Sequence, residues 1–299
     1  LGAHRPVAPA ADAVAIAQDR AREKAHFTRC GVACAPYAVI EAPAQLQAVS
    51  AELLPGVLKT CRLGYDGKGQ VRVKTRAELA AAWDELRNVP CVLEKLLPLA
   101  AECSVIVARG HDGQLVHLPP QLNLHRDGIL AVTEVHEAAM PATQARALVE
   151  STRAIAEGLR YVGVLCVEFF VLADGSLVVN EMAPRPHNSG HYSMDACDVS
   201  QFELQVRALA GLPLVQPRQH SAAVMLNLLG DLWFAQGDSE RAPPWDRVLA
   251  MPGVHLHLYG KLSARKGRKM GHLTITGNDP QGARASALEA AALLGIAAF

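Results

Sequence analysis

Residues 164–191 read VLCVEFFVLADGSLVVNEMAPRPHNSGH, and the rest of the chain can be interpreted from this stretch. Two runs rich in β-branched and aromatic residues flank Asp174-Gly175, a dipeptide that favours a two-residue β-hairpin loop. In the register set by such a loop, Glu168 and Glu181 face each other on one side of the hairpin. The Cβ atoms of residues paired in this way lie roughly 4.5–5.5 Å apart. The sequence therefore predicts a cross-strand pair of carboxylates.

Two facing carboxylates need a compensating charge, because like charges opposite each other destabilise a sheet by up to about 1 kcal/mol. A divalent cation supplies that charge, and Mg²⁺ commonly binds one or two carboxylates together with substrate phosphates. The alternatives are a bulge that separates the two glutamates, or one glutamate that lies in solvent. The loop after the second strand favours the metal site, because it gathers polar and cationic side chains: Arg185, His187, Asn188, Ser189 and His191.

The composition limits the class of protein. The chain has 299 residues, half of them hydrophobic, and a formal net charge of zero, whereas nucleic-acid-binding proteins usually carry a basic stripe. Its seven cysteines form no CxxC pair, which is typical of a reducing cytoplasm. No apolar run is long enough to span a bilayer. We expect a cytoplasmic protein that acts on small molecules, with no nucleic-acid polymer and no membrane as partner.

Hydrophobic patterning and breakers predict alternating helical and extended segments. We expect helices over 14–30, 43–53, 78–87, 143–159, 200–209 and 282–294. We expect strands over 36–40, 57–61, 91–97, 222–229, 254–259 and 271–276, a strand-turn-strand unit over 102–119, and a loop at His125, Asp127 and Gly128. The proline-rich link 213–217 divides this α+β chain into a domain over 16–212 and a small β-rich domain over 218–299.

The N-terminal part carries two further expectations. Residues 1–15 are rich in alanine and proline, and the chain begins with Leu1 instead of methionine. We therefore expect residues 1–15 to be a linker, or the remnant of a missing N-terminal domain. Arg20 and Lys24 fall on one face of the helix predicted over 14–30, and such a face is solvated by default.

Lys59 and the glycine-rich stretch after it form a candidate phosphate site. A lysine inside an apolar strand either extends its head group to water or points at an anion. The stretch RLGYDGKGQVRV, residues 62–73, holds three glycines between two strands, and glycines let successive backbone N–H groups approach an anion. It does not fit the Walker or dinucleotide patterns. Alone it indicates a flexible turn, but with Lys59 it predicts a flap over phosphate oxygens.

Two other segments allow more than one interpretation. The strand ending at 94–97, with Glu94 or Glu102, either presents polar groups to an adenine and ribose or runs out into solvent. The stretch KLSARKGRKMGH, residues 261–272, is a solvated loop, a polynucleotide contact or a site for one small phosphate. In an otherwise neutral chain the small phosphate is favoured, because arginine matches phosphate oxygens bidentately.

The order and spacing of these motifs resemble the ATP-grasp superfamily. The motifs are Lys59, GYDGKGQ at 64–70, EKLL at 94–97 with Glu102, and NEMAPRPHNSGH at 180–191. More narrowly they are similar to the 5-(carboxyamino)imidazole ribonucleotide synthases, also called phosphoribosylaminoimidazole carboxylase ATPase subunits. The resemblance implies two α+β subdomains that clasp ATP, with the clasping part at about 57–100. It also implies a small C-terminal domain and a glycine-rich α/β domain before residue 16.

The resemblance implies a role for particular residues. ATP contacts would come from Arg20, Lys59, Gly64, Tyr65, Asp66, Gly67, Lys68, Gly69, Gln70, Glu94, Lys95, Leu96, Leu97, Glu102, His125, Asn180 and Glu181. Mg²⁺, with Mn²⁺ as the alternative, would bind Glu168 and Glu181. Bicarbonate, carboxyphosphate and the imidazole nucleotide would contact Tyr65, Asp66, Arg185, His187, Asn188, Ser189, Lys261, Arg268 and Lys269. The catalytic group would be Arg185, Asn188, His191 and Lys59.

The implied reaction carboxylates aminoimidazole ribonucleotide with ATP and bicarbonate, in de novo purine biosynthesis and in a homodimer. Many ATP-grasp proteins carry an asparagine where Ala183 stands, so Asn180 or water would replace that ligand. The rival interpretations are another ATP-grasp ligase, similar to a formate-using glycinamide ribonucleotide transformylase or a biotin carboxylase, and a noncatalytic nucleotide-binding module. The identity of the substrate that accepts the carboxyl group distinguishes the first rival. Glu181→Gln distinguishes the second, because a catalyst should lose turnover whereas a noncatalytic module would keep its partner interaction.

Overall fold

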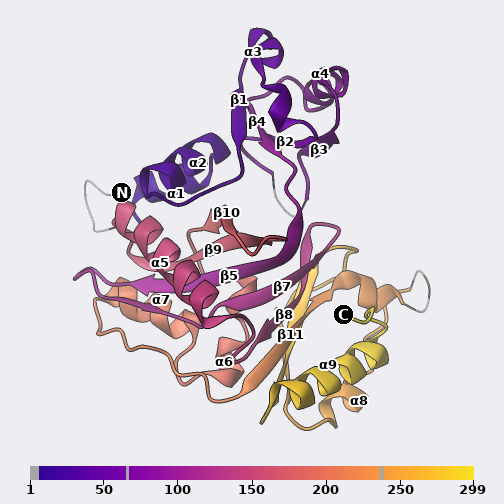
Figure 1. The fold of residues 1–299 in the computed structure, drawn as a ribbon. Coiled ribbons are helices and arrows are strands. Elements are labelled where there is room, and N and C mark those ends of the chain that lie inside the picture. Colours follow the sequence, from indigo (N-terminus) through magenta and orange to yellow (C-terminus); the bar gives the residue numbers. More distant parts are fainter. Residues whose placement is uncertain (1–6, 65–66, 236, 238) are drawn as a thin grey trace.

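A computed structural model describes residues 7–64, 67–235, 237 and 239–299. It contains two antiparallel sheets, one of four strands in the order β1-β4-β2-β3 and one of nine strands. The large sheet has the order β10-β9-β5-β7-β8-β11-β13-β12, with β6 paired to β5. Figure 1 shows the small sheet standing above the edge of the large one, with helices α3 and α4 beside it. The mixture confirms the predicted α+β class.

The small sheet and the helices beside it lie within residues 37–95. Its elements are β1 (Tyr37–Ile40), α3 (Pro43–Ala48), η1 (Ala51–Leu53), β2 (Gly56–Thr60), β3 (Gln70–Val73), α4 (Arg76–Glu85) and β4 (Cys91–Lys95). The helix predicted over 43–53 is wrong in extent, because the backbone leaves the helical conformation at Val49 and a short 3-10 turn follows. Trp83 of α4 and Leu58 of β2 belong to the same buried cluster, which holds α4 against the sheet.

The large sheet comprises β5 (Leu99–Arg109), β6 (Leu115–His117), β7 (Gln121–Arg126), β8 (Ile129–Val135), β9 (Gly163–Leu172), β10 (Leu177–Ala183), β11 (Ala222–Leu229), β12 (Val254–Leu258) and β13 (Lys269–Gly277). The helical elements outside residues 37–95 are α1 (Ala11–Ala17), α2 (Arg20–Arg29), α5 (Ala142–Gly158), η2 (Asn188–Gly190), α6 (Ser193–Ala196), α7 (Gln201–Ala210), η3 (Gly230–Phe234), α8 (Trp245–Leu249) and α9 (Pro280–Leu294).

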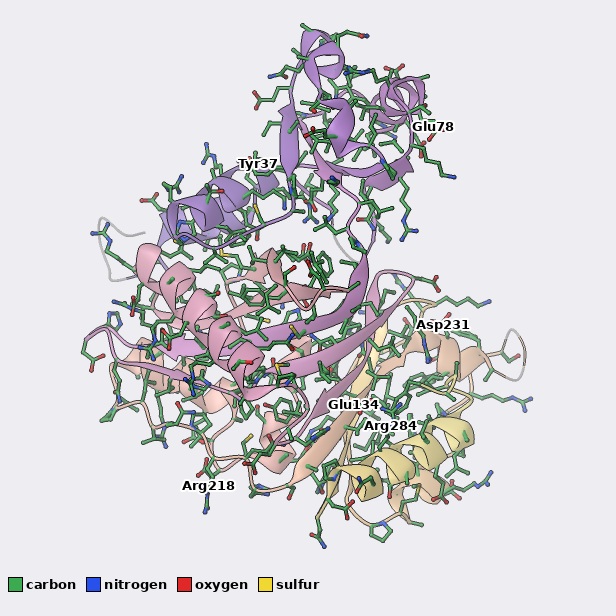
Figure 2. The ribbon with its side chains drawn as sticks, in the orientation of Figure 1. Tyr37, Glu78, Glu134, Arg218, Asp231 and Arg284 are labelled. Atoms are coloured by element: carbon green, nitrogen blue, oxygen red, sulfur yellow. The ribbon has the colours of Figure 1, made fainter. Side chains whose placement is uncertain are left out.

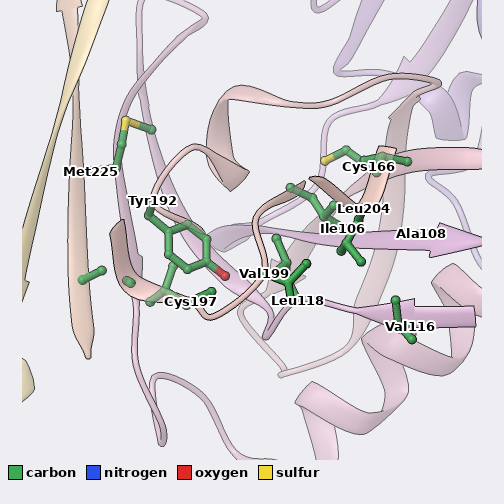
Figure 3. Close-up of a cluster of buried hydrophobic side chains, with 14 of the residues drawn as sticks. Ile106, Ala108, Val116, Leu118, Cys166, Tyr192, Cys197, Val199, Leu204 and Met225 are labelled. Carbon is green, nitrogen blue, oxygen red and sulfur yellow. The ribbon is translucent and has the colours of Figure 1, made fainter. Parts of the chain in front are cut away.

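Strand β5 shows how the large sheet is buried. Because successive side chains of a strand point to opposite faces, Val105 and Val107 enter one buried cluster with α5, whereas Ile106 and Ala108 enter another. Figure 3 shows the second cluster, in which Tyr192 lies among aliphatic side chains. Helices therefore cover both faces of this strand.

Two expectations about local structure are wrong. The helix predicted over 14–30 is two helices, because Asp19 leaves the helical conformation and its side chain accepts a hydrogen bond from the backbone N–H of Arg22. An aspartate at such a position caps the second helix. His125 lies on β7, a strand that the sequence did not predict, and not in a loop. The strands predicted over 222–229, 254–259 and 271–276 are present as Ala222–Leu229, Val254–Leu258 and Lys269–Gly277, and they continue the large sheet.

The C-terminal strands join the large sheet through β8 and β11, which pair over four residues. Helix α9 packs on β11 and β13 in a third buried cluster. Arg284 of α9 also donates a hydrogen bond to Glu134 of β8, and Figure 2 shows these two side chains between the helix and the sheet. The domain boundary at 213–217 stays a prediction. Within the described residues, no helix is long and apolar enough to cross a membrane.

Candidate active site

Strands β9 and β10 place Glu168 opposite Glu181, and the two residues are paired in the antiparallel ladder. The loop that joins the strands differs from the predicted one. The backbone N–H of Leu172 donates to the carbonyl of Ser176, so the loop has three residues, 173–175. Three-residue hairpin loops commonly place a glycine in the left-handed region. Gly175 is such a residue, with a φ of 82°.

A β-bulge restores the predicted pairing of the glutamates. Close to the loop, Val179 faces Phe169, which is one residue out of the register expected from a two-residue loop. The register then shifts between Val179 and Glu181, so that Asn180 is the extra residue. Bulges redirect side chains near functional sites. Here the bulge returns Glu181 to the position opposite Glu168.

The two glutamates differ in charge state. Arg20 of α2 lies 2.9 Å from a carboxylate oxygen of Glu181. Burial alone would raise the pKa of Glu181, but the charge and hydrogen bond of Arg20 outweigh it and hold that pKa below its usual value. Burial and the neighbouring negative charge of Glu181 raise the pKa of Glu168 to about 8. Without a cation, the pair therefore retains one proton at neutral pH.

This donor set fits a magnesium ion. Glu168 and Glu181 supply facing carboxylate oxygens, and the amide oxygen of Asn180 is buried without a hydrogen-bond partner among the described residues. Mg²⁺ prefers oxygen ligands and tolerates few protein ligands when phosphates complete its coordination. A cation would also take the place of the proton that burial retains on Glu168.

Lys59 of β2 donates a hydrogen bond of 2.9 Å to Glu94 of β4, and the ammonium of Lys24 lies 3.0 Å from the other oxygen of Glu94. Burial alone would raise the pKa of Glu94, but the two lysines outweigh it and lower that pKa. Lys24 is only 1% exposed, so the default expectation that the face of Arg20 and Lys24 is solvated is wrong. Lys59 is thus held beside the cleft by an ion pair.

A cleft of about 790 Å³ lies between the two sheets. It is lined by residues of the small sheet, such as Lys59, and of the large sheet, such as Glu168. Among the predicted site residues, the cleft brings together Arg20, Lys59, Gly64, Gly67, Lys68, Gln70, Glu102, His125, Glu168, Asn180, Glu181, Arg185, His187 and Lys269. Its lining within the described residues leaves out Gly69, Glu94, Lys95, Leu96, Leu97, Asn188, Ser189, His191, Lys261 and Arg268.

The glycine-rich loop joins β2 to β3 at the mouth of the cleft. Tyr65 and Asp66 of this loop lie outside the described residues. Gly67 has a φ of 75°, and a side chain there would meet the carbonyl oxygen of Asp127, at the β7–β8 turn, at 3.2 Å. The loop therefore comes close to the large sheet, as expected of a flap, and its left-handed backbone and this tight contact favour glycine at position 67.

Histidines with opposite pKa shifts line the same cleft. Burial would lower the pKa of His125, but its hydrogen bond to Glu102 and the negative charge of that residue raise it. His187 lies 3.6 Å from Glu168. Burial, with the positive charges of Arg185 and other cations, lowers the pKa of His187 to about 3, so this imidazole is neutral.

The loop 187–191 is mostly buried. Asn188 is 8% exposed, and neither polar atom of its amide has a partner among the described residues. Ser189 accepts a hydrogen bond of 2.8 Å from Ser104, and the ring of His191 contacts the Gln201 side chain at 2.9 Å. Asn188 therefore has an amide without a hydrogen-bond partner among the described residues, whereas His187 is the member of this loop that lines the cleft.

The three predicted phosphate ligands of the C-terminal part lie close together on β13 and the loop before it. Lys261 donates to the carbonyl of Lys269, and Arg268 donates to the carbonyl of Ser263 at 3.2 Å. Of the three, Lys269 lines the cleft. The cluster therefore reaches the cleft edge through Lys269, and its role in binding a small phosphate stays a prediction.

The sequence reasoning missed Glu23. This side chain is 3% exposed and accepts a hydrogen bond of 2.7 Å from the backbone N–H of Met182. Burial and the charge of Glu181 raise its pKa to about 8. Its position three residues after Arg20 was the available signal, because both residues face β10 from the same side of α2.

Family models match most of the chain. A model of the ATP-grasp domain matches residues 25–202, and a model of the phosphoribosylaminoimidazole carboxylase C-terminal domain matches residues 223–286. A curated relative from Brucella melitensis, an N5-carboxyaminoimidazole ribonucleotide synthase, is 43% identical over 271 residues. That alignment covers 90% of this chain and 72% of the relative.

Solved structures agree. The N5-carboxyaminoimidazole ribonucleotide synthetase of Thermus thermophilus is 33% identical with a TM-score of 0.88, over 100% of this chain and 78% of its own. The synthase of Aspergillus clavatus, solved with ADP and 5-aminoimidazole ribonucleotide, is 26% identical with a TM-score of 0.87, over 98% and 78% of the two chains. With the ATP-grasp model covering over half of its length, this chain belongs to the N5-carboxyaminoimidazole ribonucleotide synthase family of ATP-grasp enzymes.

Proposed function

We propose that this chain carboxylates 5-aminoimidazole ribonucleotide on its exocyclic amine, using ATP and bicarbonate and releasing ADP and phosphate. The reaction is a step of de novo purine biosynthesis. The observation that carries the proposal is the facing pair Glu168 and Glu181, with Arg20 and Lys59 beside it in one cleft. The complex of the Aspergillus clavatus relative with ADP and the ribonucleotide supports the choice of ligands.

ATP would bind with its phosphates between the two sheets. Phosphoryl transfer depends mostly on positioning and on charge neutralisation. Glu168 and Glu181 would hold Mg²⁺, or Mn²⁺ in its place, which when bound offsets the negative charge of the phosphate oxygens. Arg20 and Lys59 would neutralise the remaining charge, and the backbone N–H groups of loop 64–70 would close over the phosphates.

Bicarbonate would attack the terminal phosphate of ATP to give carboxyphosphate and ADP. Arg185 lines the cleft and is a cation suited to hold these anions bidentately. Asn188, next to the cleft-lining His187, would orient the same anions through an amide that has no partner among the described residues. The neutral imidazole of His187 can accept or donate a hydrogen bond without adding charge. Closure of the flap would exclude water, which otherwise hydrolyses carboxyphosphate.

The ribonucleotide phosphate would bind the cationic cluster Lys261, Arg268 and Lys269. Lys269 lines the same cleft as Arg185, so a nucleotide held there by its phosphate would extend towards the anion site. Its exocyclic amine would then attack the carboxyl carbon of carboxyphosphate, and phosphate would leave. His191, at the end of the loop, would position this part of the site.

We also propose a homodimer that forms through α7. Phe202, Val206 and Leu209 repeat at helical spacing on the outer face of α7 and are 37%, 62% and 43% exposed. Exposed apolar stripes of this kind mark interaction sites. Val206→Glu should lower the mass measured by light scattering to that of a monomer, whereas Arg146→Glu on α5 should not.

All seven cysteines lie in the described part of the chain and are free, which supports a cytoplasmic location.

The experiment is ADP release from purified protein with Mg²⁺, ATP and bicarbonate, with and without 5-aminoimidazole ribonucleotide. Strong stimulation by the ribonucleotide, but not by biotin or by glycinamide ribonucleotide with formate, is the expected result. Stimulation by one of the other acceptors would assign a different ATP-grasp reaction. Absence of ADP release with every acceptor, in protein that still binds ATP, would contradict a catalytic role for this chain.

A further inference from the structure

A second cluster of ligating side chains lies outside the cleft. His257 of β12 and His272 of β13 are directly opposite in the antiparallel ladder, and their rings are stacked with centroids 4.6 Å apart. Asp195 of α6 reaches the same place, with a carboxylate oxygen 2.9 Å from Nε2 of His257. One ligand atom from each of the three residues lies within 4.8 Å of the others. Among the described residues that line the cleft, these three are absent.

His272 has a ring nitrogen that is ready to bind a metal. The side chain is 1% exposed, and its Nδ1 lies 3.0 Å from the hydroxyl of Tyr259. Its Nε2 is buried without a hydrogen-bond partner among the described residues. Burial, together with His191 and His257, lowers the pKa of His272 to about 3, so the ring is neutral. A neutral imidazole whose Nδ1–H donates to an outer partner presents its lone pair at Nε2, which is the usual arrangement of a metal-bound histidine.

The donor atoms define the class of ion. Two imidazole nitrogens and one carboxylate oxygen suit zinc and neighbouring first-row transition ions, and zinc sites with three protein ligands keep an open fourth position. Mg²⁺ prefers oxygen ligands and so belongs to the glutamate pair. We propose that Asp195, His257 and His272 form a binding site for a divalent transition ion of the zinc class, separate from the magnesium site.

To close on an ion, the three ligand atoms must come nearer and the stacked rings of His257 and His272 must tilt apart, because each imidazole lone pair lies in its ring plane. Zinc–nitrogen bonds of about 2.0–2.1 Å set tetrahedral ligand atoms roughly 3.3 Å apart. Strand β12 is the last in the sheet order, so His257 can shift without breaking a pairing on its outer side. The His257 side chain is 31% exposed, which gives an ion a path from solvent.

An ion at this place would connect α6 to strands β12 and β13, and both of these parts lie next to loop 187–191. Asp195 follows loop 187–191 in the chain, and the rings of His191 and His272 are 4.9 Å apart. The ion would therefore fix α6, and with it the end of that loop, against β12 and β13. We expect ion binding to raise the temperature of unfolding, because it stabilises only the folded chain.

Titration with Co²⁺ in a large excess of Mg²⁺ tests the proposal. We expect one Co²⁺ per chain, with the visible absorption of a four-coordinate ion and without the near-ultraviolet band of a cobalt–thiolate bond, which excludes the cysteines. Zn²⁺ should displace the Co²⁺ and raise the unfolding temperature. Asp195→Asn and His257→Gln should each weaken Co²⁺ binding by at least about 100-fold, because even outer partners of metal ligands contribute roughly 10–100-fold.

His111→Gln is the matched control, because this histidine is exposed on the β5–β6 turn, and it should bind Co²⁺ as the unaltered chain does. Mg²⁺–ADP binding reports whether each variant is folded, and if Asp195→Asn does not fold, His257→Gln carries the test. The proposal is overturned if the unaltered chain takes up no Co²⁺ in excess Mg²⁺. It is also overturned if Asp195→Asn and His257→Gln bind Co²⁺ as tightly as His111→Gln does.

Discussion

Glu168 and Glu181 face each other across β9 and β10 because two irregularities in the hairpin cancel. The three-residue loop shifts the strands by one residue, and the bulge at Asn180 shifts them back. A one-residue slip would turn one carboxylate to the opposite face of the sheet. The bulge therefore determines whether the two side chains can share a cation.

Replacing one carboxylate should remove catalysis. Glu181→Gln keeps the shape of the side chain but loses the charge that Arg20 and a cation contact. We expect turnover to fall by about 100-fold or more, since a single preorganised electrostatic contact contributes roughly 10²–10³ to the rate. Steady-state ADP release at saturating ATP checks this. Glu137→Gln is the control, because Glu137 is an exposed glutamate that does not line the cleft. Equal rates in both variants would contradict the assignment.

The stability of the metal-free protein should fall as the pH rises from about 6.5 to 8. The pKa values of Glu168 and Glu23 are raised to about 8 in the folded chain, so folding retains protons that the unfolded chain has released. The pKa values of His187, His191 and His272 are lowered to about 3, and their opposite contribution fades as the pH rises above 6.5, where unfolded histidines lose their protons. Urea unfolding at several pH values measures the slope, which Glu168→Gln should reduce. A stability that rises over this range would contradict the raised pKa values.

Lys59→Ala should weaken ATP binding while leaving the small sheet folded. Glu94 keeps its second partner, Lys24, so the buried carboxylate is not left without a positive charge. A hydrogen bond to a charged group contributes about 1.5–3 kcal/mol, which corresponds to roughly 10–100-fold in affinity. Calorimetric titration with Mg²⁺–ATP checks this, and Lys74→Ala, an exposed lysine just after β3, is the matched control. An unchanged affinity would remove Lys59 from the phosphate site.

Arg268→Ala should raise the Michaelis constant for 5-aminoimidazole ribonucleotide by about tenfold or more, with little change for ATP. Arg268 lies near Lys261 and Lys269, where a phosphate would bind, and does not line the cleft that holds Glu181. Arg265→Ala, an exposed arginine in the same loop, should leave both constants unchanged. Initial rates with each substrate varied in turn measure the effect. Equal increases for the two substrates would count against a role in binding the ribonucleotide phosphate.

Much of the fold could be predicted from local sequence signals. Alternating side chains and the Asp174-Gly175 turn located β9 and β10, and Gly211 ended α7 with a φ of 69°, as a helix-terminating glycine does. The bulge at Asn180 could not be predicted, because nothing in the local residues distinguishes a two-residue from a three-residue loop. The pairing of the glutamates was right, although the predicted loop was wrong.

The less predictable features depend on distant contacts. Lys24 was expected on a solvated helix face and Glu23 carried no prediction, because their burial depends on the packing of α2 beside β4 and β10. Strand β7 carries polar side chains that the protein buries in hydrogen bonds, such as that from Asn123 to Ser104, so its pattern did not indicate a strand. Asp195, His257 and His272 come from three elements, and their proximity could be predicted only from the order of the strands in the sheet.

Isotope transfer tests the central claim most directly. With ¹⁸O-labelled bicarbonate, Mg²⁺–ATP and 5-aminoimidazole ribonucleotide, one labelled oxygen attacks the terminal phosphorus and stays with it when the amine displaces phosphate. The account predicts one bicarbonate-derived ¹⁸O in each phosphate released, together with a carboxylated ribonucleotide, and neither product from Glu181→Gln. Phosphate whose new oxygen comes from water would contradict carboxyphosphate formation in this cleft.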